Sequence, residues 1–425
     1  MSEDFLHFIY KHKLWSNELI LSSGKTFEVL DTGLQNYDSG PDFFNAKIKI
    51  DDKIWVGNVE IHINSSDWYK HKHHKDLSYN NVILHIVYSN DKDIEYANGE
   101  KIPTWEMRFK HVLYNKYSEL KIIENPIPCS DYIELVDEFN IGMWLQRMSI
   151  DRLLKKVDYI DKLLPKYNND WEQAFYISLA RNFGFGTNAV PFEQLAFQTP
   201  VNIIRKYSDN IIKIEAILFG QSGLLPESHE DAYVKTLISE YKFLKHKYKL
   251  DPIRREIWKG SKMHPANFPC IRIAQFAGLL INFQGLFAKI TEDIKLEDIH
   301  KYFMIKTSEY WESHYNFEKK SVSSCKNLGS SSINVLIINT IIPFKYHYSK
   351  NFKRNSISES FTIELLNEIK AENNREVRMW RSLNVIPNNA FESQALINLK
   401  KDYCDQKKCL DCSIGYEIMK KISKL

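Results

Sequence analysis

Glycine and proline are scarce in this sequence, with 15 glycines and 13 prolines among 425 residues. This scarcity excludes a collagen-like chain and argues against extended disorder or long linkers. No run of about 18 apolar residues is present, so we expect no transmembrane helix. The chain starts Met-Ser-Glu-Asp and lacks a basic segment followed by an apolar one, so a secretory signal is not expected. A soluble cytoplasmic protein without a membrane partner is therefore predicted.

Net charge and cysteine are also low. The 57 basic and 54 acidic residues give a formal charge of +3 at pH 7. Such a balance neither demands nor excludes a nucleic-acid partner, because a local basic stripe can be hidden in a neutral total. In a cytoplasmic protein the six cysteines are expected to be free thiols or metal ligands and not disulfides.

The remaining composition is that of a folded globular protein, with 44% apolar and 26% charged residues. A chain of this length is too long for one ordinary core, so more than one unit is expected. Up to about residue 110 the apolar spacing predicts, in order, a helix (3–14), three strands (26–30, 43–50, 54–63), a short helix (65–74) and strands (81–88, 104–109). Beyond residue 112 helical spacing dominates, in segments 139–157, 171–183, 201–219, 231–248, 271–290 and 361–375. We predict an α+β protein with a sheet-containing domain, 1–111, followed by a mainly helical domain, 112–425.

The second and third predicted strands form the most informative pair. A two-residue turn at Asp51-Asp52 joins them as a hairpin. The favoured register pairs Ile50 with Lys53, Ile48 with Trp55, Ala46 with Gly57, and Phe44 with Val59. This register places the apolar residues on one face and leaves Asn45, Asn58, Glu60 and His62 on the other.

In this register Asp42 is a diagonal neighbour of Glu60. Two carboxylates at this separation repel each other unless a cation or proton lies between them, and hard oxygen ligands suit Mg²⁺ or Mn²⁺. Strict alternation would turn Asp42 towards the apolar face. We therefore expect a bulge or bend at Gly40-Pro41 that turns Asp42 towards Glu60.

These features resemble the PD-(D/E)XK nuclease superfamily. Pro41-Asp42 lies at the start of the second predicted strand, and Glu60-Ile61-His62 lies on the third. The resemblance implies a restriction-endonuclease-like α/β core, a metal ion held by Asp42 and Glu60, an additional acid at Glu3, and nucleic acid as partner. His62 takes the place of the superfamily's lysine, which orients or activates the attacking water. A histidine could act there as a base or as a third ligand.

Other histidines lie close by in the sequence. His71 and its neighbours His73 and His74 could contact phosphate or assist a metal, or they could form a solvated helix end. His85, inside an apolar strand, has the pattern of a hydrogen-bonded core residue.

The whole chain also resembles a bacterial family of unknown function. The resemblance rests on residues 40–43, 59–62, 66–68 and 82–87, and it continues in residues 180–185, 218–223 and 267–269. It supports the fold and implies no activity.

Three cysteines near the end, Cys404, Cys409 and Cys412, have the spacing C-x4-C-x2-C. This spacing resembles both an iron–sulfur loop and a zinc knuckle. A fourth ligand is then needed, and Cys325 is the cysteine candidate. Cys129 and Cys270 are interpreted as structural. The alternative is a set of reduced thiols at the start of a helix.

Two classes of function follow from these patterns. The first is a metal-dependent nuclease that hydrolyses phosphodiester bonds, with DNA expected before RNA, in which Asp42, Glu60 and His62 perform the chemistry. The second is a degenerate nuclease-like module that binds nucleic acid or a protein without cutting. Metal binding distinguishes them.

Overall fold

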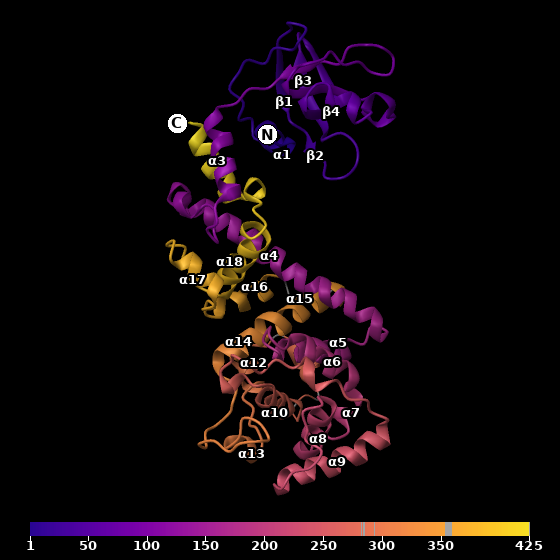
Figure 1. The fold of residues 1–425 in the computed structure, drawn as a ribbon, viewed down its shortest axis with the longest axis vertical. Helices are drawn as coiled ribbons and strands as arrows, with labels where there is room; N and C mark the ends of the chain where they lie inside the picture. Colours follow the sequence, from indigo (N-terminus) through magenta and orange to yellow (C-terminus); the bar gives the residue numbers. More distant parts are fainter. Residues whose placement is uncertain (282, 284, 293, 353–358, 425) are drawn as a thin grey trace. The chain divides into compact units, whose positions relative to one another are not determined.

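The computed structural model describes residues 1–281, 283, 285–292, 294–352 and 359–424 (Figure 1). It divides the chain into two compact units. The first contains residues 1–144 together with 399–425, and the second contains residues 145–398. The chain thus leaves the first unit once and returns to it at its end. The boundaries between these units lie after residues 144 and 398, whereas the sequence analysis placed a single boundary after residue 111. The C-terminal cysteines belong to the same unit as the sheet.

A mixed sheet forms the centre of the first unit, as the alternating patterns predicted. Strands β1, β3 and β4 are antiparallel, whereas β4, β5 and β6 are parallel, in the order β1-β3-β4-β5-β6. Strand β2 pairs with β3 outside this path; with two residues it is too short to show a period in the sequence. The elements are α1 (Glu3–Lys11), β1 (Phe27–Asp31), β2 (Leu34–Gln35), β3 (Phe43–Ile50), β4 (Lys53–Asn64), α2 (Asp67–Lys70), the 3-10 turns η1 (His73–Lys75) and η2 (Leu77–Tyr79), β5 (Val82–Ser89) and β6 (Thr104–Glu106).

The hairpin register is confirmed over most of its length. Ile50 pairs with Lys53, Ile48 with Trp55, and Ala46 with Gly57. The predicted pairing of Phe44 with Val59 is wrong, because the register shifts and Val59 pairs with Phe43. Asn45 lies within the shift with φ of 55°, a left-handed conformation that asparagine tolerates better than most residues. A bulge at this point moves each preceding residue of β3 to the other face.

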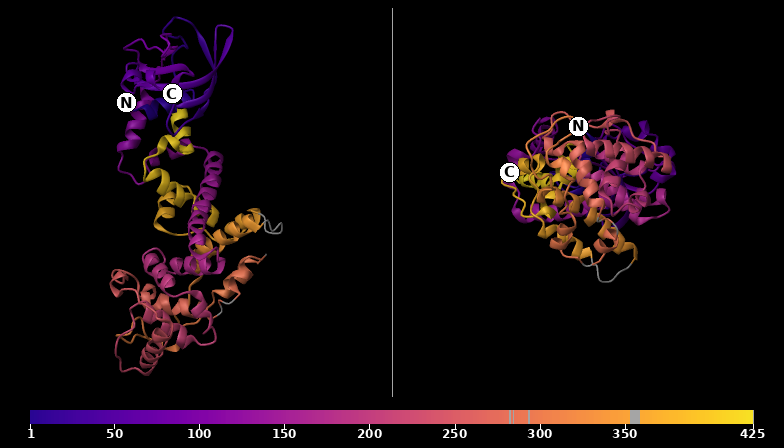
Figure 2. Two further views of the ribbon diagram at one scale, coloured as in Figure 1. Left: turned by 90° about the vertical axis from the view of Figure 1, so that its right-hand side faces the viewer. Right: turned by 90° about the horizontal axis from the view of Figure 1, so that it is seen from below.

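The first unit is completed by segments that are far apart in the sequence. Helix α3 (His111–Ile122) and the 3-10 segment η3 (Ser130–Leu135) both pack against the C-terminal helix α19 (Ser413–Ser423). Figure 2 shows this last helix, in yellow, beside the magenta α3. Between α18 and α19 lie the π-helical turn η8 (Lys400–Cys404) and the 3-10 turn η9 (Cys409–Asp411).

The second unit is helical, as predicted, and it has a continuous apolar core. The predicted helix at 201–219 is divided, because Asn210 caps a new helix with its side chain. Likewise the segment 271–290 forms two helices and not one. No helix among the described residues has the length and apolar character needed to cross a membrane. The main helices of the second unit are α4 (Glu138–Leu163, which begins in the first unit), α5 (Trp171–Phe183), α6 (Ala189–Gln198), α7 (Val201–Arg205), α8 (Ile211–Gln221), α9 (Ala232–Tyr248), α10 (Pro269–Leu280), α11 (Leu286–Ile290), α12 (Leu296–Tyr302), α13 (Glu309–Glu312), α14 (Ser330–Leu336), α15 (Ile342–Phe352), α16 (Glu359–Glu368), α17 (Arg375–Arg381) and α18 (Ala390–Leu399).

Candidate metal centre

Two carboxylates from neighbouring strands meet at the end of the hairpin. The backbone N–H of Asp42 donates to Glu60 Oε2 at 3.2 Å, and the N–H of Ile61 donates to Asp42 Oδ2 at 2.8 Å. The bulge at Asn45 explains this geometry, because it turns Asp42 to the face that carries Glu60. Gly40 does adopt a φ of 101°, but the register shift that the sequence placed at Gly40-Pro41 lies further along the strand.

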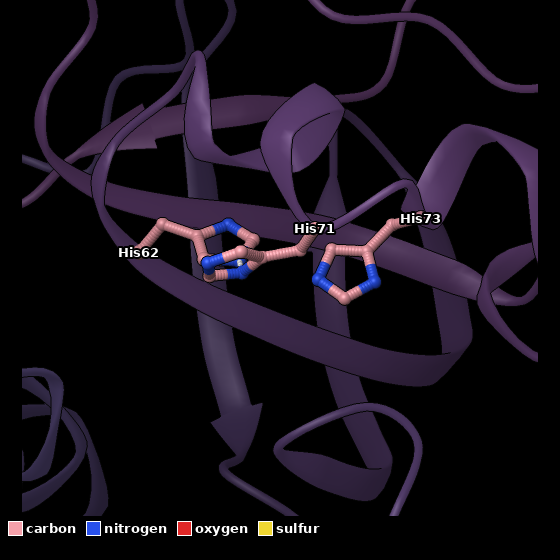
Figure 3. A group of neighbouring side chains, drawn as sticks. All are labelled: His62, His71 and His73. Carbon is pink, nitrogen blue, oxygen red and sulfur yellow. Dashed lines mark hydrogen bonds between the residues drawn. The ribbon is translucent and has the colours of Figure 1, made fainter.

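Glu60 is also the centre of a group of imidazoles. Its Oε1 lies 3.4 Å from His62 Nε2 and 3.2 Å from His73 Nε2. His62 Nε2 lies 3.1 Å from His71 Nδ1. Figure 3 shows the three rings side by side, with His62 on the sheet and the other two on the segment after α2. We call Glu60, His62, His71 and His73 the histidine site.

These distances suit a tetrahedral metal ion. Bonds of about 2.0–2.1 Å to nitrogen or oxygen place neighbouring ligands about 3.3 Å apart around such an ion. One ligand nitrogen from each of His62, His71 and His73 lies within 4.8 Å of the other two. His73 Nε2 is moreover buried, with Glu60 Oε1 as its polar neighbour.

His85 fixes the orientation of His62. The nitrogen His85 Nε2 lies 2.8 Å from His62 Nδ1, so Nε2 of His62 is the nitrogen that faces the carboxylate. Both side chains are buried. Burial, followed by the nearby imidazoles, lowers the pKa of His62 to about 2, and burial lowers the pKa of His85 to about 3. His62 is therefore neutral at physiological pH, as a metal ligand must be.

Glu60 has a pKa far above that of an ordinary carboxyl. Burial first and the charge of Asp42 second raise the pKa of Glu60 to about 9. Without a cation the carboxyl therefore keeps its proton at neutral pH. A divalent ion at the histidine site would reverse this preference, because a nearby positive charge favours the carboxylate.

Helix α1 adds two residues to the same place. His7 Nε2 lies 3.2 Å from Asp42 Oδ2. Although burial opposes it, the hydrogen bond and charge of Asp42 raise the pKa of His7. Glu3 lies one turn earlier on the helix, and its pKa is raised by burial and then by Asp42.

A cleft opens beside His7. It has a volume of about 570 Å³ and lies between α1, the segment after β2, α3 and the loop that contains the C-terminal cysteines. Its lining includes both signs of charge, with Lys11, Lys121, Lys407 and Lys408 against Asp4, Asp38 and Asp411. His7 connects the cleft with the carboxylate pair, because it lines the cleft and contacts Asp42; Asp42 and the histidine site are not part of the lining.

Of the residues that the sequence assigned to the metal and its chemistry, Asp42, Glu60 and His62 come together, and Glu3 lies one turn from His7 on α1. Sequence reasoning missed His7, whose spacing of four residues from Glu3 places both on one helix face. It also favoured a solvated end for His71 and His73. Their proximity to His62 depends on the turn after α2, which no local pattern reveals.

The comparisons with known proteins place the chain in a family. A family model described as "Protein of unknown function (DUF2851)" matches residues 3–375. No curated protein and no solved structure matches this sequence. Since the match covers most of the residues, including the whole of the histidine site, the chain belongs to the DUF2851 family of proteins of unknown function.

Proposed function

We propose that this protein is a metal-dependent nuclease that hydrolyses phosphodiester bonds, with DNA as the first substrate to test and RNA as the second. The observation that carries the proposal is the convergence of Asp42 with the histidine site beside an open cleft. The strand order around it, with three antiparallel strands followed by two that run parallel to the third, supports the resemblance to PD-(D/E)XK nucleases.

The ligand chemistry favours a particular class of metal. Three imidazole nitrogens and one carboxylate suit zinc or manganese better than magnesium, which prefers oxygen ligands and bound water. The ion would lower the pKa of a bound water and neutralise charge that develops in the transition state. His62, His71 and His73, whose ligand atoms lie within 4.8 Å of one another, would hold the ion. Glu60 would approach it from the side of His62 and His73, and His85 would keep His62 aligned.

Asp42 and His7 are proposed as the residues that handle protons. Both contacts of the Asp42 carboxylate, from Ile61 and from His7, use Oδ2. Its other oxygen, Oδ1, is then the atom through which Asp42 would bind the ion or orient a water. His7 lines the cleft and has a raised pKa, so near neutral pH it can donate a proton to a leaving group.

The cleft supports a polyanionic substrate. Lysines from three separate segments line it: Lys11 from α1, Lys121 from α3, and Lys407 with Lys408 from the C-terminal loop. Lysines spaced along a groove neutralise the phosphates of a nucleic-acid strand and release its counterions. Nucleic-acid binding by this cleft should therefore weaken as the salt concentration rises.

The test is a nuclease assay with the full chain. Plasmid, linear duplex, single-stranded DNA and RNA are each incubated with Zn²⁺, Mn²⁺ or Mg²⁺. We expect cleavage with Zn²⁺ or Mn²⁺. His7→Ala should reduce the rate by about a hundredfold, which is a usual contribution of a general acid. Asp93→Asn is the control, because Asp93 pairs with Lys101 on the surface, outside the histidine site.

The alternative is a module that binds without cutting. His62, in the place of the superfamily's lysine, is the feature that favours it. Tight metal binding with no cleavage of any of the four substrates would refute the nuclease proposal and leave the binding module. Cleavage that is lost in His7→Ala and kept in Asp93→Asn would refute the binding module.

A further inference from the structure

Four cysteines of the first unit lie in segments that pack together. Cys404 ends η8, Cys409 begins η9, and Cys412 immediately precedes α19, while Cys129 immediately precedes η3. We call these four residues the cysteine quartet. Cys325, which the sequence suggested as the fourth ligand, is exposed and belongs to the second unit.

The packing explains why Cys129 joins the three C-terminal cysteines. Helix α19 contacts both η9 and η3, so the segments that begin at Cys409 and Cys129 rest on one helix. The side chain of Lys407 donates to the carbonyl of Ile123, six residues before Cys129. Lys407 itself has a φ of 53°, as a tight turn between Cys404 and Cys409 requires.

The quartet is largely closed to solvent. Cys129, Cys404 and Cys412 are buried, and Cys409 is partly buried. The turn η8 contacts η9, and η9 and η3 both contact α19, so the four cysteines lie on one packed group of segments. Thiolates from such a group are suitable ligands for a soft or borderline metal.

We propose that the cysteine quartet binds an iron–sulfur cluster, with Cys129 as the fourth ligand. Iron–sulfur clusters and zinc both take thiolate sulfur as a ligand. The spacing of the cysteines along the sequence is therefore the feature that separates the two. The C-x4-C-x2-C spacing of the last three cysteines is one that iron–sulfur proteins use, with a fourth cysteine elsewhere in the chain.

Zinc and a cluster make different demands on the quartet. A zinc ion with bonds of about 2.3 Å holds all four sulfurs about 3.8 Å apart, whereas the ligands of a cluster bind different iron atoms and lie further apart. In the described part of the chain the four sulfurs do not form a group whose members all lie within 4.8 Å of one another. The metal content of the protein therefore decides between the two.

Gly415, three residues after Cys412, lies where the turn η9 packs on α19. A Cβ atom there would collide with the carbonyl of Cys409, so only glycine lets η9 approach α19 this closely.

The quartet would determine the shape of the cleft. The loop between Cys404 and Cys409 carries Lys407 and Lys408, and both line the cleft that His7 also lines. A bound cluster would hold this loop on η3 and α19. The inference does not rest on the proposed nuclease function, since the cysteines and the histidine site are separate groups of ligands.

The test is the metal content of the full chain, purified without oxygen after expression with added iron. We expect brown protein with broad visible absorbance and about two to four iron and as many sulfide ions per chain. The ratio and the electron paramagnetic resonance of the reduced protein give the type of cluster. Cys129→Ser should lose most of the iron and the visible absorbance.

Two controls make the result specific. Cys270→Ser replaces another buried cysteine, in the second unit, and Cys325→Ser replaces the exposed one; both should keep the iron. Loss of iron in Cys325→Ser with retention in Cys129→Ser would overturn the assignment of the fourth ligand. If Cys129→Ser fails to fold, the wild-type protein still decides the main point. One zinc ion per chain without sulfide, or four freely reactive thiols without metal, would overturn the cluster.

Discussion

Metal binding at the histidine site should release a proton from Glu60. In the metal-free protein the pKa of Glu60 is raised to about 9, so at pH 7 roughly 99% of this carboxyl is protonated. His62 and His73 contribute little, because the pKa of His62 is lowered to about 2 and that of His73 is also lowered. A cation that takes Glu60 as a ligand must displace its proton.

The magnitude follows from the two pH units between 7 and 9. Removing the proton at pH 7 costs about 3 kcal/mol of the binding free energy. This cost disappears as the pH rises, so the affinity for Zn²⁺ or Mn²⁺ should increase about tenfold per pH unit between pH 7 and pH 9. Above pH 9 the carboxyl is already ionised and the affinity should become constant.

Calorimetry in two buffers of different ionisation enthalpy measures the number of protons released. Wild type should release about one proton more than Glu60→Gln, which keeps a carbonyl oxygen as ligand but has no proton to lose. The difference between the two proteins removes any contribution from His7, Asp42 and Glu3, which surround the same carboxyl. Equal proton release by both proteins would refute the placement of the ion against Glu60.

Two further substitutions test residues that position the histidine site. His85→Leu removes the partner of His62 Nδ1 and should lower metal affinity about tenfold to a hundredfold, as measured by competition with a chelator; unchanged affinity would show that His85 does not orient the ligand. Asn45→Val places a β-branched residue at a φ of 55° and should lower the free energy of unfolding by about 1–3 kcal/mol and weaken metal binding, whereas Asn45→Gly should do neither. Urea unfolding and the same competition assay give both quantities, and equal effects of valine and glycine would contradict the role of the bulge.

The sheet could be predicted because its strands have a clear local signal. Strand β3 (Phe43–Ile50) has the predicted limits, since apolar and polar residues alternate along it. The bulge could not be placed by the same means. Asn45 is a polar residue on the polar face in either register, and only the pairing of Phe43 with Val59 reveals the shift.

The proposed ligands that the sequence underestimated come from irregular segments. His71 and His73 reach His62 through a turn in which Lys72 has a φ of 65°, and neither apolar spacing nor composition records such a turn. Cys129 was interpreted as structural for a related reason. The distance of 275 residues between Cys129 and Cys404 gives no local indication that the chain returns to the first unit.

The return of the chain has a consequence for synthesis on the ribosome. Residues 1–144 emerge first, and residues 145–398 follow before the segment that completes the same unit. At about 5–20 residues per second, this delay lasts roughly tens of seconds. During that time the nascent sheet lacks α19, and Cys129 lacks the three cysteines that lie with it in the finished protein. The helical unit can fold meanwhile as an insertion, so the quartet is assembled last, and Cys129 is the member that stays without its partners for the longest time.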